Sequence, residues 1–428
     1  PGQPLHALIA HVAIALPLGP IPWRMASLST GTELLAAWWV IRIVQALQQS
    51  TRHDAAQPFD QNATLTGWVQ YAAPDAAAMG FLLSSVVLRQ ALRIEVYGLA
   101  LALSLYGTYH AIRWMQHARL THLGQATFAA TLCMSVHAPH ALAPLGMILC
   151  SLFVVPWRRW LSGPFILAGS MATFCGLAFL SWLPLRAYAG APMWGKPSTG
   201  QGFWDYLSAR AYQHNLGATE HSWLHQSLDA LGFAIAACGI LPIVGMGLAL
   251  LQIAHLPSYQ RKLHIAVILG ALFALAAGCL QPLQVRNPDN IAYFGPVVAL
   301  MLATGAAGFS WWSTSHHNGI LSACGLLLIA LNIPTLSSIP SILEAEIPAL
   351  ETFSEVLTEA PPPKSLVIVE TDFTAAAWMM AQAIDGARPD IALFISGLAT
   401  SSWHWQTLRA HPYFDGRPRR GRGQTAMQ

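Results

Sequence analysis

Long apolar stretches constrain this chain more than any motif does. A membrane-spanning helix needs about 20 predominantly apolar residues. Only 10% of the 428 residues are charged, whereas soluble globular domains carry about 25%. The sequence therefore predicts an all-α polytopic membrane protein. We expect ten spans, at 26–48, 66–88, 95–115, 125–139, 141–156, 164–185, 230–253, 263–281, 293–312 and 318–336.

The remaining sequence predicts three other parts. Residues 1–25 contain Pro17, Pro20 and Pro22, and we expect a juxtamembrane helix at the interface there. The transmembrane domain covers 26–336 and includes a long external loop at 186–229. Residues 337–428 predict an extramembrane αβ tail, with strands at Leu366–Glu370 and Ile391–Ser396, a helix at 373–384 and a disordered end at about 416–428.

Basic residues in short loops predict the orientation. Arg52, Arg119, Arg158 and Arg261 mark loops that we assign to the cytoplasm. The loop 186–229 and the C-terminal tail then lie on the non-cytoplasmic side. The ratio of 19 Arg to 3 Lys is typical of a GC-rich genome, so we expect a bacterial inner membrane. A net charge of +3 over this length gives no basic surface for nucleic acid.

Ionisable residues within apolar segments are candidates for function because their burial is costly. Glu33, Asp75 and Glu95 are such acids, and each also has a structural interpretation as a capped or paired acid. Glu95 is favoured because it opens a span on the side predicted for the other motifs. His137-Ala-Pro-His140 interrupts two apolar runs and is a candidate for binding phosphate or an acceptor. Pro139 argues against a regular helix there, and we predict no metal site.

The segment around Arg186 places a cation and aromatic side chains directly after a span. Arg186 suits phosphate, Trp194 suits sugar stacking or an interfacial aromatic belt, and Lys196 lies in a tight turn. Arg286 adds a second cation before the span at 293–312. Glu220, His221 and His225 have helical spacing but form only a weak metal pattern, more typical of a solvated helix.

Several of these motifs together resemble one known family. They are the opening Pro1-Gly-Gln-Pro-Leu5, Glu95-Val-Tyr97, the His137/His140 corner, Leu183-Pro-Leu-Arg186 with Trp194-Gly-Lys196-Pro197, and Arg388-Pro-Asp390. The family comprises polytopic proteins formerly catalogued as a domain of unknown function and related to a eukaryotic transmembrane protein O-mannosyltransferase. It is similar to a branch of the GT-C glycosyltransferases. The resemblance runs from residue 1 to about 410.

The resemblance implies an inverting transferase that moves a sugar, with mannose as a candidate, from a polyprenyl-phosphate donor to a protein or glycan acceptor. Its site would lie on the non-cytoplasmic face. Glu95 would be an auxiliary catalytic acid that orients the acceptor or assists the general base. His137, His140, Arg186 and Arg286 would bind the donor phosphate, and Tyr97 and Trp194 would stack on sugar or lipid.

Two expectations qualify this assignment. The family's general base lies in a first external loop that would precede residue 1, so we expect the chain to be a fragment without that loop and the span before it. The family also has an acid where Lys196 stands. A flippase or transporter of lipid-linked sugars and a catalytically inactive membrane scaffold remain alternatives. A transporter would favour inverted repeats, and the sequence shows none.

Overall fold

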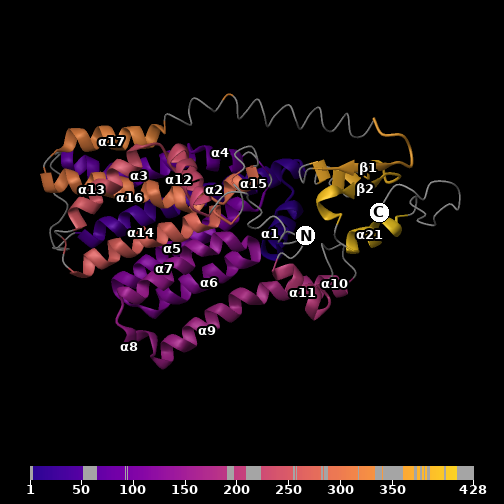
Figure 1. Cartoon of the computed structure of the whole chain (residues 1–428), viewed down its shortest axis with the longest axis horizontal. Helices are drawn as coiled ribbons and strands as arrows, with labels where there is room; N and C mark the ends of the chain where they lie inside the picture. Colours follow the sequence, from indigo (N-terminus) through magenta and orange to yellow (C-terminus); the bar gives the residue numbers. More distant parts are fainter. Residues whose placement is uncertain are drawn as a thin grey trace. The chain divides into compact units, whose positions relative to one another are not determined.

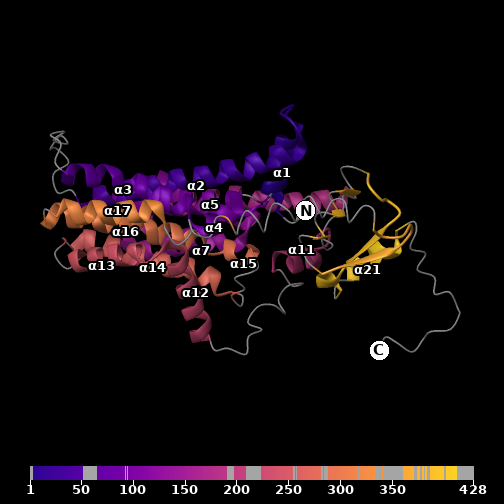
Figure 2. The same cartoon turned by 90° about the horizontal axis from the view of Figure 1, so that it is seen from above.

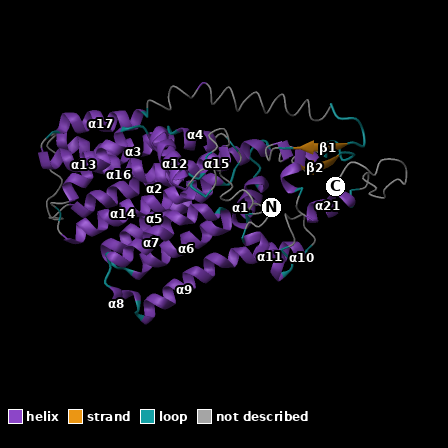
Figure 3. Ribbon diagram, viewed as in Figure 1, coloured by secondary structure: helices purple, strands orange, loops and turns teal. Residues whose placement is uncertain are grey.

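The computed structural model is mostly helical and has a small two-stranded sheet (Figure 3), which confirms the predicted all-α polytopic fold class. It divides into a helical unit, Gln3–Trp182 with Asn215–Ile342, and a smaller unit, Pro1–Gly2 with Leu183–His214 and Leu343–Gln428. The structure describes residues 3–51, 65–91, 93, 95–189, 197–208, 223–253, 256, 258–280, 283, 288–316, 318–332, 340, 360–370, 374–375, 378–379, 381–382, 386–399 and 402–411.

Helices or broken helices lie at all ten of the predicted spans. The first half of the helical unit contains α1 (Pro4–Ala15), α2 (Ile21–Thr51), α3 (Leu65–Leu82), α4 (Ser85–Ala91), α5 (Tyr97–His117), α6 (Leu120–Val136), η1 (Ala138–Ala141), α7 (Leu142–Cys150), η2 (Ser151–Phe153), α8 (Trp157–Trp160), α9 (Gly163–Ala178) and η3 (Phe179–Ser181). After α10 (Trp182–Tyr188), the unit resumes with α12 (Trp223–Cys238), α13 (Leu241–Ile253), α14 (Ser258–Gly278), α15 (Pro288–Ala292), α16 (Gly295–His316) and α17 (Gly319–Leu331).

Within the described part of the chain, three helical segments are long and apolar enough to cross a membrane by themselves: Gly163–Tyr188, Ser258–Gly278 and Gly295–Ser315. Two further candidates are bent pairs, α3 with α4 and α12 with α13. The number of crossings therefore stays a prediction.

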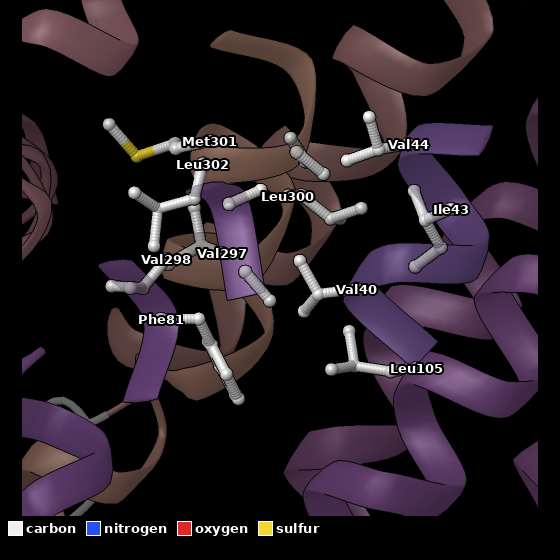
Figure 4. Packing of buried hydrophobic residues seen from close by; sticks show 14 of the residues in the cluster. Val40, Ile43, Val44, Phe81, Leu105, Val297, Val298, Leu300, Met301 and Leu302 are labelled. Atoms are coloured by element: carbon white, nitrogen blue, oxygen red, sulfur yellow. The ribbon is translucent and has the colours of Figure 1, made fainter. Parts of the chain in front are cut away.

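Helix α16 occupies the centre of the helical unit, and α2, α3, α13, α14 and α17 all pack against it. Figure 4 shows Val297, Val298 and Leu300 of α16 among side chains of α2, α3 and α5. About 89% of the most apolar 18-residue stretch of α16 is buried. Small residues allow this close packing, since a side chain at Gly308 would meet the backbone of Gly245 on α13.

The predicted span at 230–253 is not one straight helix, because α12 and α13 meet at 104°. Gly239 takes a φ of +79° between them, and its N–H donates to the carbonyl of Ile235 at 2.8 Å. Glycine adopts this left-handed conformation without steric cost and commonly ends a helix there. Figure 2 shows α12 turning away from the direction of α13. The segment 66–88 is likewise bent, by 63°, between α3 and α4.

The smaller unit contains a parallel pair of strands, β1 (Leu366–Val369) and β2 (Ala392–Ile395), in which Leu366 pairs with Ala392. Both predicted strands are thus confirmed. The described parts of the predicted helix at 373–384 are helical. The unit also contains α11 (Gly200–Leu207), η5 (Ser396–Leu398) and α21 (Ser402–Arg409). The small core of the tail is formed by Val369, Ala375, Trp378, Ile391, Ile395 and Leu398.

Candidate functional site

The chain breaks at His137, as the sequence predicts. His137 ends α6 in an extended conformation, with φ −156° and ψ 100°, and the 3₁₀ turn η1 follows. Pro139 occupies the first turn of η1, where its missing N–H would have no helical partner. The corner places the Nδ1 atoms of His137 and His140 at 2.7 Å from each other.

This short contact constrains the protons on the two rings. A hydrogen bond between two Nδ1 atoms needs one ring to donate and the other to accept, so the pair holds one Nδ1 proton in total. In the doubly neutral pair, the donor ring has an unprotonated Nε2 and the acceptor ring has a protonated one. The two Nε2 atoms thus comprise one acceptor and one donor, and the Nε2 of His140 is buried.

Two tyrosines surround the histidine pair. The Tyr97 ring, at the start of α5, lies 5.0 Å from the His137 ring and 6.3 Å from the His140 ring, measured between centroids. The Tyr293 ring, directly after α15, lies 4.8 Å from the His137 ring. We call these four residues the external aromatic cluster, after the side of the membrane that the sequence predicts for this end of the bundle. It joins α5, η1 and α15 and includes three residues predicted for the site.

Charged groups lie beside this cluster. Arg93 and Asp289 form an ion pair at 3.2 Å, with side chains 11% and 33% exposed. The charges of Arg93, Glu95 and Asp289 all act electrostatically on the Tyr97 hydroxyl. Glu95 is half-buried and lies two residues before α5 rather than within it. The chain thus assembles two acids, one cation and the external aromatic cluster at one end of the bundle.

A third acid lies behind the start of α5. Glu33 on α2 is 1% exposed, and neither carboxyl oxygen has a hydrogen-bond partner among the described residues. A Cβ atom added to Gly98 would lie 2.5 Å from Thr32 Oγ1 and 3.1 Å from Glu33 Oε1. The absence of a side chain at Gly98 therefore allows α5 to approach this polar face of α2. Asp75, in contrast, is exposed on α3.

The other predicted site residues have different outcomes. Arg186 belongs to the smaller unit and is exposed on α10. Trp194, Lys196 and Arg286 lie outside the described residues, as do Glu220 and His221. His225 is exposed on α12. Within the described part of the chain, no three His, Cys, Asp or Glu residues form a group that could hold a metal ion.

The sequence-based site did not include Arg93, Asp289 or Tyr293. Arg93 and Asp289 are 196 positions apart, so local spacing gives no sign of their pairing. The available signal was two opposite charges, each close to a predicted span on the same side.

No protein-family model matches the chain, and no curated protein matches its sequence. Among solved structures, the chain is similar to ArnT from Cupriavidus metallidurans, in a crystal structure bound to undecaprenyl phosphate. The TM-score is 0.53 at 12% sequence identity, and the alignment covers 94% of this chain and 78% of ArnT. The likeness shows a GT-C-like fold.

Proposed function

We propose that the chain is a membrane glycosyltransferase that uses a polyprenyl-phosphate-linked sugar as donor. The observation that carries the proposal is the fold shared, over 94% of this chain, with a GT-C glycosyltransferase whose structure holds undecaprenyl phosphate. The external aromatic cluster and the charges beside it add a polar site at one end of an otherwise apolar bundle. Such sites in membrane proteins are functional candidates by default.

The proposed reaction is a displacement at the anomeric carbon of the sugar. An acceptor hydroxyl oxygen attacks this carbon, the bond to the lipid phosphate oxygen breaks, and the phosphate leaves with the bonding electrons. The acceptor proton passes to a general-base carboxylate, and Glu95 orients the acceptor or assists that base. Cations that hold the leaving phosphate lower the barrier, because negative charge develops there in the transition state.

The residues take the following proposed roles. His137 and His140 bind the donor phosphate or orient the acceptor. Arg186, Lys196 and Arg286 supply positive charge to the phosphate. Tyr97 and Trp194 stack on the sugar or the lipid. We also propose mannose as the sugar, a protein or glycan as the acceptor, and the non-cytoplasmic face of a bacterial inner membrane as the location.

Transfer can be measured in membranes that contain the full chain. Polyprenyl-phosphate [³H]mannose is added, and tritium is followed into precipitable protein and into the glycan fraction, against membranes from cells without the chain. The proposal expects transfer that falls at least tenfold in Glu95→Gln and in Arg186→Ala. Release of free polyprenyl phosphate is the second readout, because it reports bond cleavage whichever acceptor is used.

Two outcomes would contradict the proposal. Label that crosses the membrane without leaving its lipid would indicate a flippase. Unchanged transfer in both variants would remove Glu95 and Arg186 from the site. The variant Asp75→Asn, at an exposed position on α3, is the control for loss of a carboxylate elsewhere in the helical unit.

A further inference from the structure

A second histidine pair lies at the opposite end of the α5–α6 hairpin. Helix α5 runs from Tyr97 to His117, and α6 returns from Leu120 to Val136. At about 1.5 Å per residue, α5 is ~30 Å long, which matches the hydrocarbon thickness of a bilayer. With the span predicted at 95–115, the C-terminal end of α5 is expected near the membrane surface opposite the external aromatic cluster.

The cluster at this end contains three histidines. His110 Nδ1 lies 3.0 Å from His122 Nδ1, and the His117 ring centroid lies 6.2 Å from that of His122. Among the described residues, the Arg113 and Arg119 guanidinium groups act electrostatically on these rings. These five residues, together with Arg42 on α2, form what we call the basic cluster.

The basic cluster contains no compensating acid among the described residues. Arg113 donates to Gln49 Oε1 at 2.7 Å and to Gln116 Oε1 at 3.2 Å. Arg42 donates to the Tyr109 hydroxyl at 3.3 Å. All these hydrogen-bond acceptors are neutral. The residues that act electrostatically on the three histidines are themselves basic. Guanidinium groups that accumulate without a carboxylate repel one another unless an anion joins them.

An apolar stripe on α2 leads to the basic cluster from within the membrane. Leu34, Trp38 and Arg42 are spaced four residues apart and therefore share one face of α2. Leu34 is 56% exposed and Trp38 is 51% exposed. The Arg42 guanidinium lies 5.9 Å from the centroid of the Trp38 ring. An exposed apolar stripe that ends in a cation fits a molecule with an acyl chain and an anionic head.

We propose that the basic cluster binds the phosphate of an anionic glycerophospholipid, with an acyl chain along Leu34 and Trp38. Arginine guanidinium groups and histidine N–H groups donate hydrogen bonds to phosphate oxygens. Basic pockets between membrane helices bind lipid head groups in this way. The site is separate from the proposed donor site, since it lies at the other end of α5, and its test does not depend on transferase activity.

The test measures lipid retained by the purified full chain. Native mass spectrometry counts phosphatidylglycerol and phosphatidylcholine bound from an equimolar mixture. We expect about tenfold preference for phosphatidylglycerol. The double variant His117→Gln/Arg119→Gln changes only exposed side chains and should reduce that preference at least fivefold; Arg42→Gln should reduce it as well.

The matched control is Arg158→Gln/Arg159→Gln, which removes two exposed charges from α8, on the same predicted side of the membrane. It should keep the preference within twofold. An equal loss in both double variants would overturn the proposal, because it would reflect general surface charge. Complete displacement of the lipid by 10 mM inorganic phosphate would also overturn it, since the site would then recognise free phosphate rather than a lipid.

Discussion

His137 and His140 share a 2.7 Å contact between their Nδ1 atoms, and α5 holds the corner that makes this contact. Ser104 Oγ of α5 donates to the backbone carbonyl of His140 at 2.8 Å. The Tyr97 ring, also from α5, lies near both imidazoles. The position of the pair is therefore set by backbone and ring contacts that remain when one imidazole is replaced.

The variant His140→Gln tests the pair directly. It removes the Nδ1 partner of His137 and should lower kcat/KM for transfer from polyprenyl-phosphate mannose by at least tenfold, which corresponds to about 1.4 kcal/mol of transition-state stabilisation. The midpoint of thermal unfolding reports whether the fold is retained. His225→Gln, at an exposed site on α12, is the control and should keep wild-type kinetics. Wild-type kinetics in His140→Gln would remove the pair from the site.

Gly98→Ala tests the close approach of α5 and α2. The added methyl group would lie 2.5 Å from Thr32 Oγ1, so the helices must separate, at a cost of about 1–3 kcal/mol. Gly31→Ala is the control, because a Cβ atom at Gly31 meets nothing within 4 Å and alanine favours a helix. Thermal unfolding in detergent measures both. Adding Thr32→Ala to Gly98→Ala should recover part of the loss; no recovery would contradict the proposed contact.

Glu33→Leu separates stability from function. Leucine removes a buried carboxyl group whose oxygens have no hydrogen-bond partner among the described residues. Because an unsatisfied buried polar group costs about 1–3 kcal/mol, the variant should unfold at a higher temperature than the wild type. A fall in transfer rate together with this rise would indicate that Glu33 serves the reaction. A lower unfolding temperature would show that the carboxyl group is stabilising where it lies.

His404 should make the stability of the tail depend on pH. Its Nε2 accepts a hydrogen bond from the Ile395 N–H at 3.0 Å, and burial lowers the pKa of the imidazole. The unfolded tail therefore binds a proton more readily than the folded tail, and stability should fall as pH drops below about 6.5. Hydrogen exchange at the Ile395 amide, corrected for intrinsic rates, should show less protection at pH 5.5 than at pH 7.5.

Two comparisons make this pH prediction specific. His404→Gln keeps a hydrogen-bond acceptor but has no proton to gain, so its protection should not change between these pH values. Asp390 does not contribute in this range, because its hydrogen bonds from Arg388 and from the Lys364 N–H lower the pKa of its carboxyl to about 2. The same pH dependence in His404→Gln would assign the effect to another group.

Apolar length predicted where the helices lie, because the bilayer fixes the length of a span. Pro139 predicted the corner at His137, because proline restricts the local backbone directly. The bend at Gly239 was not predicted, since hydropathy measures apolar content and does not show where a helix changes direction. The ion pair between Arg93 and Asp289 was not predicted either, because it depends on tertiary packing across 196 residues.

The central position of α16 has a consequence for biosynthesis. Helices α2 and α3 are synthesised more than 200 residues before α16, which later packs between them and α13. At about 5–20 residues per second, the inner faces of α2 and α3 wait for at least ten seconds before their partner emerges. During that interval, lipid or an insertion factor must cover surfaces that the finished protein hides. Assembly of the helical unit is therefore completed only when α16 inserts among helices that were synthesised earlier.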